Sequence, residues 1–445
     1  MTRLLFRAAP LTLAALVMAE PALAQEAAEP AADAVGGGTA YILNTLLFLI
    51  GGFLVMWMAA GFAMLEAGLV RSKNTSVQCI KNIGLYSIAG LMFWVVGYSI
   101  AYPGFGEDSL GLFGIAGFPY AMQGVGEADL GTGYSVASDW FFQMVFCATT
   151  ASIVSGTVAE RVKIVPFFLF VVVLTAVIYP VVVSWEWGGG YLDSVHGFSD
   201  FAGSTLVHST GGWAALVGAL IIGPRLGRYG ADGKVNVFPG ANIPLATLGT
   251  FILWLGWFGF NGASQLAMGT VGDVSDVSKI FVNTNMAAAA GVVVAIVATL
   301  VRYKKADVTM ALNGALAGLV AITAEPLAPT VGQAIVIGGI GGLLPVIFVP
   351  LLDKLKIDDV VGAIPVHLVA GIWGTMIVPW TGDATFGGQA VGVLLTAVWA
   401  SAASAVVWLA LKYTIGVRPS EEEEMNGLDI GETGIEAYPE FARTA

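Results

Sequence analysis

The chain has few charged residues and few of the side chains that build soluble active sites. Only 11% of its 445 residues are Asp, Glu, Lys or Arg, and 57% are hydrophobic. A soluble protein carries roughly twice that charge fraction. Two cysteines and three histidines provide no zinc-binding spacing, and the sequence contains no phosphate-cradling glycine loop. We therefore expect no metal, no cofactor, no ATP-driven motor and no nucleic-acid partner.

Long apolar runs recur along the sequence instead. They approach the ~20 residues that a helix needs to cross the hydrocarbon core of a lipid bilayer. The pattern predicts an all-α polytopic membrane protein with eleven transmembrane helices. The expected spans are residues 41–66, 80–101, 138–159, 164–185, 200–223, 243–266, 280–301, 308–325, 331–352, 360–380 and 388–414.

The first 24 residues have the pattern of a signal peptide. Arg3 and Arg7 give a positive start, an apolar stretch too short to span follows, and Ala22-Leu23-Ala24 offers a small-residue cleavage site. Residues 25–40 are rich in Ala, Glu and Gly and are predicted to form a disordered extracytoplasmic linker. The mature N-terminus is therefore expected outside a bacterial-type inner (cytoplasmic) membrane.

Basic residues support this orientation, because cytoplasmic loops carry an excess of Lys and Arg. With the N-terminus outside, only Lys279 of the 17 basic residues after the signal peptide falls outside. Residues 41–414 then form the eleven-helix domain, and residues 415–445 form a cytoplasmic regulatory tail. The 16 basic residues expected inside are Arg71, Lys73, Lys81, Arg161, Lys163, Arg225, Arg228, Lys234, Arg302, Lys304, Lys305, Lys354, Lys356, Lys412, Arg418 and Arg443.

Two distant segments share an acid followed eight residues later by a histidine. Asp200 precedes His208, and Asp359 precedes His367. Eight helical residues rise about 12 Å, close to half of a ~30 Å bilayer core. Because the two spans start on opposite sides, both histidines should meet near mid-membrane. This predicts two inverted five-helix repeats plus a final helix, with a site between the repeats.

Ionisable groups at membrane depth usually face a pathway or a partner. The alternative for His208 and His367 is a neutral histidine that is hydrogen-bonded inside the bundle. Two imidazoles at one depth favour a pore or a proton relay, because a neutral ring donates from one nitrogen and accepts at the other. Asp200 and Asp359 are expected to cap their helices, and Asp200 could also keep nearby groups poised to receive a cation.

Aromatic residues form a second candidate cluster. Phe142 and Phe146 are four residues apart and share one helical face, Trp187 lies in the loop before the fifth span, and Phe260 and Ser264 lie near the outer end of the sixth. Each alone could belong to an interfacial aromatic belt. Together they offer an indole face for a cation, a hydroxyl acceptor and a phenyl barrier. A hydrogen bond or ion pair is the expected role of Glu66, and a helix back-bond that of Thr323.

Five motifs together resemble the ammonium transporter (Amt/Mep/Rh) family and cover nearly all of the chain from residue 41. The family implies an eleven-helix homotrimer with one pore per subunit. The motifs are DFAGSTLVHSTGGWAALVGALIIGPRLGR, FFQMVF, GWFGFNGAS, VGAIPVHLVAG and the tail VRPSEEEEMNGLDIGETGIEAY.

The resemblance also implies residue roles. Ammonium would be recruited outside and deprotonated, and ammonia would pass a hydrophobic pore lined by paired histidines. The proton could be co-transported, and methylammonium would serve as an analogue. The implied roles are Phe142, Trp187, Ser264 and Asp200 for recruitment, Phe146 and Phe260 for a phenyl gate, His208 and His367 for the paired histidines, and Trp257 and Thr323 for the pore lining.

Two other classes of function stay open. The pore could serve as an ammonium sensor that signals through the tail, which resembles the family segment that responds to a PII-type regulatory protein. An intramembrane hydrolase that pairs Ser264 with a histidine is the second, but Ser264 lies toward the outer surface and both histidines near mid-depth. We therefore expect a transporter rather than an enzyme.

Overall fold

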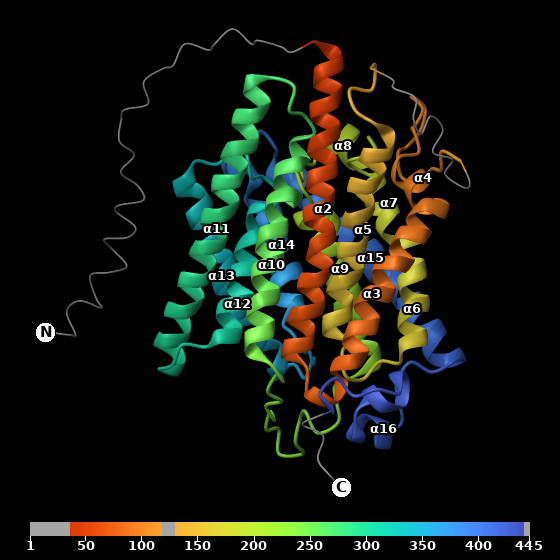
Figure 1. Cartoon of the computed structure of the whole chain (residues 1–445), viewed down its shortest axis with the longest axis vertical. Coiled ribbons are helices and arrows are strands. Elements are labelled where there is room, and N and C mark those ends of the chain that lie inside the picture. The colour runs from red at the N-terminus through yellow and green to blue at the C-terminus, as the bar shows by residue number, and fades with distance from the viewer. Residues whose placement is uncertain (1–35, 118–129, 440–445) are drawn as a thin grey trace, which may run out of the picture.

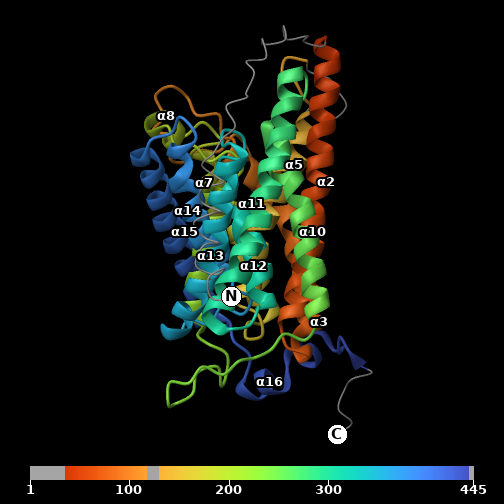
Figure 2. The same cartoon turned by 90° about the vertical axis from the view of Figure 1, so that its left-hand side faces the viewer.

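The computed structural model describes residues 36–117 and 130–439, so the predicted signal peptide lies outside the described residues. Within these ranges every regular element is helical, apart from one isolated bridge between Tyr229 and Val235. The long helices stand side by side in one bundle, with α16 below it (Figures 1 and 2). The prediction of an all-helical protein is confirmed.

Within residues 36–117 and 130–439, eight helical segments are long and apolar enough to cross a membrane, and two shorter apolar ones accompany them. The chain is therefore a multi-pass membrane protein, while the count of eleven spans stays a prediction. The helices of the bundle are α2 (Gly37–Leu69), α3 (Thr75–Met92), α4 (Tyr98–Ala101), α5 (Val136–Thr157), α6 (Ile164–Val173), α7 (Tyr179–Ser184), α9 (Thr210–Ile222), α10 (Ile243–Gly262), α11 (Val271–Tyr303), α12 (Val308–Ile322), α13 (Val331–Lys354), α14 (Ala370–Ile377) and α15 (Phe386–Thr414).

Helix ends differ from the predicted span ends where polar residues extend a helix beyond its apolar part. The helix α2 begins at Gly37, so residues 37–40 are helical and not linker. The helix α11 begins at Val271 instead of residue 280, because Thr270 and Asp273 form a capping box there. A hydropathy pattern marks the lipid boundary and not the end of the helix.

The two acid-to-histidine segments fold alike. Each begins with a π-helical stretch, η4 (Ser204–Ser209) before α9 and η6 (Ile364–Val369) before α14. The Asp200 carboxylate accepts four backbone N–H bonds, from residues 203–206. The Asp359 carboxylate accepts bonds from the N–H groups of residues 362 and 364. Both acids therefore cap their helix starts as predicted.

Two glycines set how closely these segments cross. Gly212 and Gly371 each follow a histidine by four residues. A Cβ at Gly212 would lie 2.6 Å from the Leu368 Cβ, and one at Gly371 would lie 2.5 Å from the Ser204 carbonyl oxygen. Only glycine fits such an approach. The matched landmarks support the inverted-repeat prediction, which the fold alone does not test.

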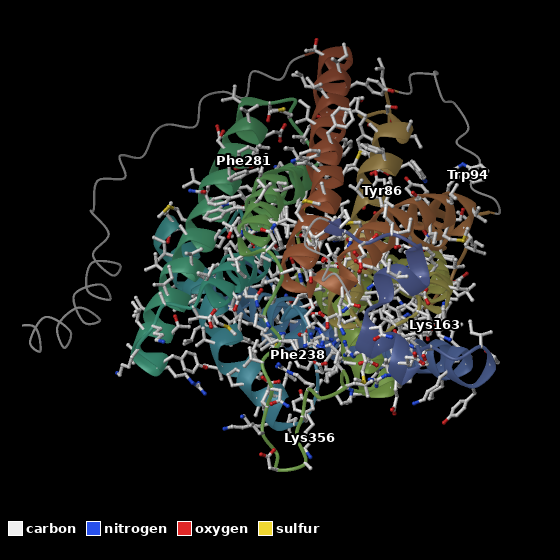
Figure 3. All side chains as sticks on the ribbon, turned by 60° about the horizontal axis from the view of Figure 1, so that its bottom comes forward. Tyr86, Trp94, Lys163, Phe238, Phe281 and Lys356 are labelled. Carbon is white, nitrogen blue, oxygen red and sulfur yellow. The ribbon has the colours of Figure 1, made fainter. Side chains whose placement is uncertain are left out.

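Charged side chains from four separate loops meet at the end of the bundle that carries α16. Arg225 binds Asp358 through Nε and Nη2 at 2.8 and 2.9 Å, and its Nη1 lies 3.3 Å from Glu160. Arg71 pairs with the same Glu160 at 2.5 Å. Both guanidinium groups also lie over the Phe238 ring, which Figure 3 labels at this end. We call Arg71, Glu160, Arg225 and Asp358 the inner ion cluster.

The tail residues pack onto the same end. Asp429 accepts hydrogen bonds from the Ser76 and Val77 N–H groups at the start of α3, both at 3.0 Å. Glu432 caps α6 in the same way through the Ile164 N–H at 3.0 Å. In the acidic run Glu421–Glu424, three side chains are exposed to solvent, whereas Glu424 is buried and pairs with Arg418 at 2.8 Å.

The inner ion cluster predicts how stability depends on pH. Burial raises the pKa of the Asp358 carboxyl, but hydrogen bonds from Arg225 and the charge of Arg161 outweigh it and hold the pKa well below its usual range. Burial also raises the pKa of the Glu160 carboxyl, but the positive charges of Arg225 and Arg71 outweigh this effect. The pKa of Glu160 is therefore lowered. A carboxyl group whose pKa is depressed in the folded state stabilises that state at a pH above its unfolded-state pKa of about 4. This stabilisation is lost as the pH falls from about 4 toward the folded-state pKa.

We therefore expect the cluster's contribution to the thermal midpoint in detergent to stay constant from about pH 7 to 5 and to fall below about pH 4. The same pH series on the Asp358→Asn variant isolates the cluster, because that variant should lose less on acidification. Equal losses for both proteins below pH 4 would contradict this assignment.

Candidate functional site

A cavity of about 340 Å³ lies among side chains of α4, α5, the loop after α7 and the short helix η5 (Ala263–Gln265). The helices α4 and α7 lie toward the end of the bundle opposite α16 (Figure 1). Three of the predicted recruitment residues line the cavity, namely Phe142, Trp187 and Ser264. They come from α5, from the loop after α7 and from η5. Tyr98, Tyr102, Tyr134 and Phe201 add further rings to its wall. A wall of aromatic rings interspersed with polar groups suits a small organic or ammonium-type cation.

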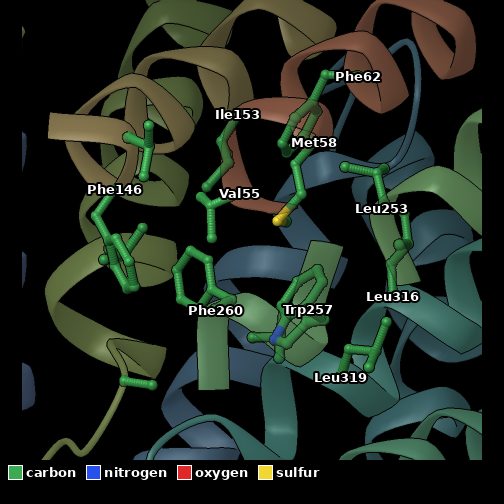
Figure 4. Packing of buried hydrophobic residues seen from close by; sticks show 14 of the residues in the cluster. Val55, Met58, Phe62, Phe146, Ile153, Leu253, Trp257, Phe260, Leu316 and Leu319 are labelled. Atoms are coloured by element: carbon green, nitrogen blue, oxygen red, sulfur yellow. The ribbon is translucent and has the colours of Figure 1, made fainter. Parts of the chain in front are cut away.

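Two phenyl rings close the inner side of this cavity. Phe146 and Phe260 stack with centroids 4.0 Å apart, and both side chains are almost completely buried. Phe142 lies 4.8 Å from Phe146 on the same face of α5, as their spacing predicts. Figure 4 shows Phe260 between Phe146 and Trp257. A solute leaving the cavity inward must displace or pass these rings.

The two histidines lie directly beyond the phenyl pair. The His208 ring is 5.3 Å from the Phe260 ring, and the His208 and His367 Nδ1 atoms are 3.2 Å apart. In this contact one ring must donate a hydrogen bond from its Nδ1–H, and the other must accept it at an unprotonated Nδ1. One Nε2 is then a donor and the other an acceptor. Since the His208 Nε2 is buried with no partner among the described residues, it is available to a passing polar molecule.

Trp257 and Thr323 hold this pair in place. The Trp257 indole stacks on His208 at 5.0 Å and donates its N–H to the Thr323 hydroxyl at 2.8 Å. Thr323 in turn donates to the Leu319 carbonyl of its own helix at 2.7 Å, which is the back-bond expected from sequence. Trp257 therefore packs directly against His208, and Thr323 fixes the orientation of the Trp257 indole.

Asp200 lies next to the cavity wall but is not among the side chains lining it. Its carboxylate is occupied by the backbone N–H groups of Gly203 and of the first three residues of η4. Its carbonyl oxygen accepts the Trp187 indole N–H at 3.0 Å. Ser264 donates its hydroxyl to the Phe260 carbonyl at 2.8 Å, which leaves oxygen lone pairs for a donor. Asp200 thus positions Trp187 and η4, and Ser264 can accept a hydrogen bond from the cavity.

Sequence reasoning missed Asp139, which also lines the outer cavity. Its carboxylate accepts hydrogen bonds from the Tyr98 hydroxyl at 2.5 Å and from the Gln143 amide at 3.4 Å. The residue stands in the run DWFFQMVF, one turn before Phe142. An acid near the start of a helix is typical of capping, so only its position among aromatic side chains could have singled it out.

A second, much smaller cavity lies on the inner side of the histidines. Its volume of about 10 Å³ is close to that of one water molecule. His367, Phe62, Glu66, Ser152 and Asn313 are among its lining residues. The Phe62 ring lies 6.1 Å from the His367 ring. Cavity, phenyl pair, histidine pair and inner cavity therefore follow one another through the bundle.

Known proteins match over most of the chain. The family model described as Ammonium Transporter Family matches residues 46–438. Ammonium transporter Amt2 of Archaeoglobus fulgidus is 41% identical, covering 89% of this chain and 88% of its own length. Ammonium transporter Amt1 of Haloferax mediterranei is 40% identical, covering 90% and 80%.

Solved structures match as well. A structure described as a Sensor Amt Protein has a TM-score of 0.83 and 36% identity, covering 89% of this chain and all of its own. Mep2 of Candida albicans has a TM-score of 0.78 and 25% identity, covering 92% of this chain and 93% of its own.

Proposed function

Because the chain belongs to the ammonium transporter family, we propose that it takes up ammonium by binding the cation outside and conducting it inward as ammonia. The succession of outer cavity, phenyl pair and histidine pair is the observation that most supports this order of events. The transporter family is not a class of enzyme, so we propose no covalent chemistry.

Recruitment takes place in the outer cavity. The Trp187 indole attracts the cation through its ring face, worth about 0.5–1 kcal/mol where exposed and ~2 or more where desolvated. The Ser264 oxygen accepts one of the ammonium hydrogens, and Phe142 supplies part of the wall. Among the described residues that line the cavity, Asp139 adds a negative charge. Potassium has no hydrogens to donate to Ser264 and is bound less well.

Deprotonation occurs at the phenyl gate formed by Phe146 and Phe260. Moving a bare ammonium ion into an apolar passage costs many kcal/mol, tens by a Born estimate, whereas a neutral polar molecule costs far less. Ammonia therefore passes the gate and meets His208. The proton follows through the Nδ1 contact of His208 and His367. Potassium cannot become neutral, so the gate rejects it.

The surroundings of the pore follow from the family and from the sequence pattern. We propose a homotrimer with one pore per subunit in an inner membrane, N-terminus outside and C-terminus cytoplasmic, made with a cleaved signal peptide. The tail is the proposed contact for a PII-type regulatory protein. The relatives from Archaeoglobus fulgidus and Haloferax mediterranei are both named ammonium transporters, which favours transport over the sensor alternative.

Uptake of radiolabelled methylammonium by purified, reconstituted protein tests the proposal. Vesicles containing the protein should accumulate label faster than protein-free vesicles, and unlabelled ammonium should compete. Uptake no faster than in protein-free vesicles, with folded protein present, would refute transport and leave the sensor function.

Replacing Asp139 by Asn should weaken recruitment. Loss of a partly solvated cation–carboxylate contact costs about 1 kcal/mol, so the half-saturating methylammonium concentration should rise roughly fivefold. The maximal rate should change little, because the gate and the histidines are untouched. Glu107→Gln, an exposed acid of the outer loop, is the matched control. An equal half-saturating concentration in both variants would exclude Asp139 from the binding site.

A further inference from the structure

A buried polar cluster lies on the inner side of the histidine pair. Its members are Glu66 of α2, Lys81 and Asn82 of α3, and Ser155 of α5, all with 3% or less of their surface exposed. Lys81 was expected in an inner loop but lies inside α3. The Glu66 Oε2 accepts hydrogen bonds from the Ser155 hydroxyl at 2.8 Å and the Asn82 amide at 3.1 Å.

The lysine joins this cluster through the same serine. Lys81 Nζ donates to the Ser155 carbonyl at 2.9 Å and to Gln78 Oε1 at 3.0 Å. A buried acid and a buried base thus share Ser155 without a direct ion pair. Charged groups at such depth are expensive unless a partner compensates them. The pair lets the carboxylate carry its charge inside the bundle.

One oxygen of this carboxyl group remains free. The Glu66 Oε1 is buried and has no hydrogen-bond partner among the residues that the structure describes. An unmade hydrogen bond at a buried carboxylate oxygen costs about 1–3 kcal/mol or more. Glu66 also lines the small inner cavity together with His367, which has room for about one water molecule. A water in this cavity would be lined by both His367 and Glu66.

We propose that Glu66 accepts the proton that leaves the histidine pair on its inner side. The proposal rests on the proposed relay. A water in the inner cavity takes a proton from the His367 ring and gives one to the Glu66 carboxylate. The O–H bond forms at Glu66 as the N–H bond at His367 breaks, and His367 is then ready for the next proton. The carboxyl group later releases the proton toward the cytoplasm, helped by the positive charge of Lys81.

The test separates charge movement from ammonia movement in proteoliposomes. Glu66→Gln should lower the ammonium-evoked current by about tenfold or more, the scale of losing a positioned proton acceptor. Entry of neutral ammonia, followed by a lumenal pH dye under an ammonia gradient, should stay near that of the unaltered protein. Glu66→Asp should recover most of the current. A merely structural glutamate would instead lower both rates together.

Two further variants control for folding and charge. Glu66→Gln combined with Lys81→Gln keeps the buried charge balanced and should lose the current as well. Glu325→Gln changes a carboxyl group of the loop after α12, which binds the Leu327 and Ala328 N–H groups, and should keep the current.

The outcomes distinguish this inference from the function on which it rests. Full current in Glu66→Gln and in the Glu66→Gln/Lys81→Gln variant, with current lost when His208 and His367 are both replaced, would overturn the role of Glu66 and leave the histidine relay standing. If the unaltered protein takes up methylammonium but gives no ammonium-evoked current, the relay and the role of Glu66 both fall, and the transport function stands.

Discussion

The protein in which both His208 and His367 are replaced by leucine should give no ammonium-evoked current above that of protein-free vesicles. Leucine fills nearly the same volume as imidazole, so the helices should still pack. It offers no donor or acceptor at the point where the two Nδ1 atoms lie 3.2 Å apart. A proton would then have to cross the apolar segment unaided, which costs tens of kcal/mol by a Born estimate.

The third histidine provides the control for this variant. His196 ends the short helix α8 (Tyr191–His196) and packs on Tyr191 at 5.0 Å, away from the histidine pair. His196→Leu makes the same chemical change and should keep the current. Solid-supported-membrane recordings on equal amounts of folded protein give the comparison. A current in the double variant equal to that of His196→Leu would refute the relay.

The largest loss of stability should follow replacement of Arg225 by leucine. Arg225 is 4% exposed and binds Asp358 with two N–H groups while also reaching Glu160. Its removal leaves buried carboxylates short of their counter-charge, and breaking such a pair costs about 3–5 kcal/mol. Thermal unfolding in detergent, followed by loss of monodisperse protein, should show a much lower midpoint.

An exposed cation at the same end is the reference for this variant. Lys305 follows α11 and has no ion pair among the described residues. Lys305→Leu should change stability by about 0.5 kcal/mol or less. Similar midpoints for the two variants would mean that the inner ion cluster adds little to the free energy of unfolding.

Spacing along the sequence was enough to predict the histidine pair. The matched acid-to-histidine spacing located both segments, and both acids cap the helical stretches that follow them. The predicted rise of eight helical residues was wrong, because residues 200–203 and 359–362 are not helical and each helical stretch begins only after them. The neighbouring positions of Phe142 and Phe146 could also be predicted, since the two residues share a helix face. The stacking of Phe146 on Phe260 joins two helices, and only the family resemblance implied it. The resemblance to the ammonium transporters, confirmed by the family match, rested on these same segments.

The sequence could not predict contacts that depend on three or more helices. From its position beside the apolar run, Lys81 is expected to be an inner-loop cation. Its amino group instead binds Ser155 of another helix, and Ser155 in turn binds Glu66 of a third. From the sequence, Asp139 is an ordinary acid near a helix start. Only the fold shows that it lines the same cavity as Trp187 and Ser264. Likewise, nothing local indicates that Asp429 caps a helix more than 300 residues earlier.

The crossing of Gly212 and Gly371 has a consequence for turnover. The histidine rings are carried by two helical segments whose backbones approach each other with no space for a methyl group at Gly212 or Gly371. Their separation is therefore set by main-chain contact and not by adjustable side chains. Transporters that alternate between two openings must rock one repeat against the other, and this crossing resists such rocking. We expect flow to run downhill in either direction, at a speed limited by gate opening rather than by reorientation of the halves.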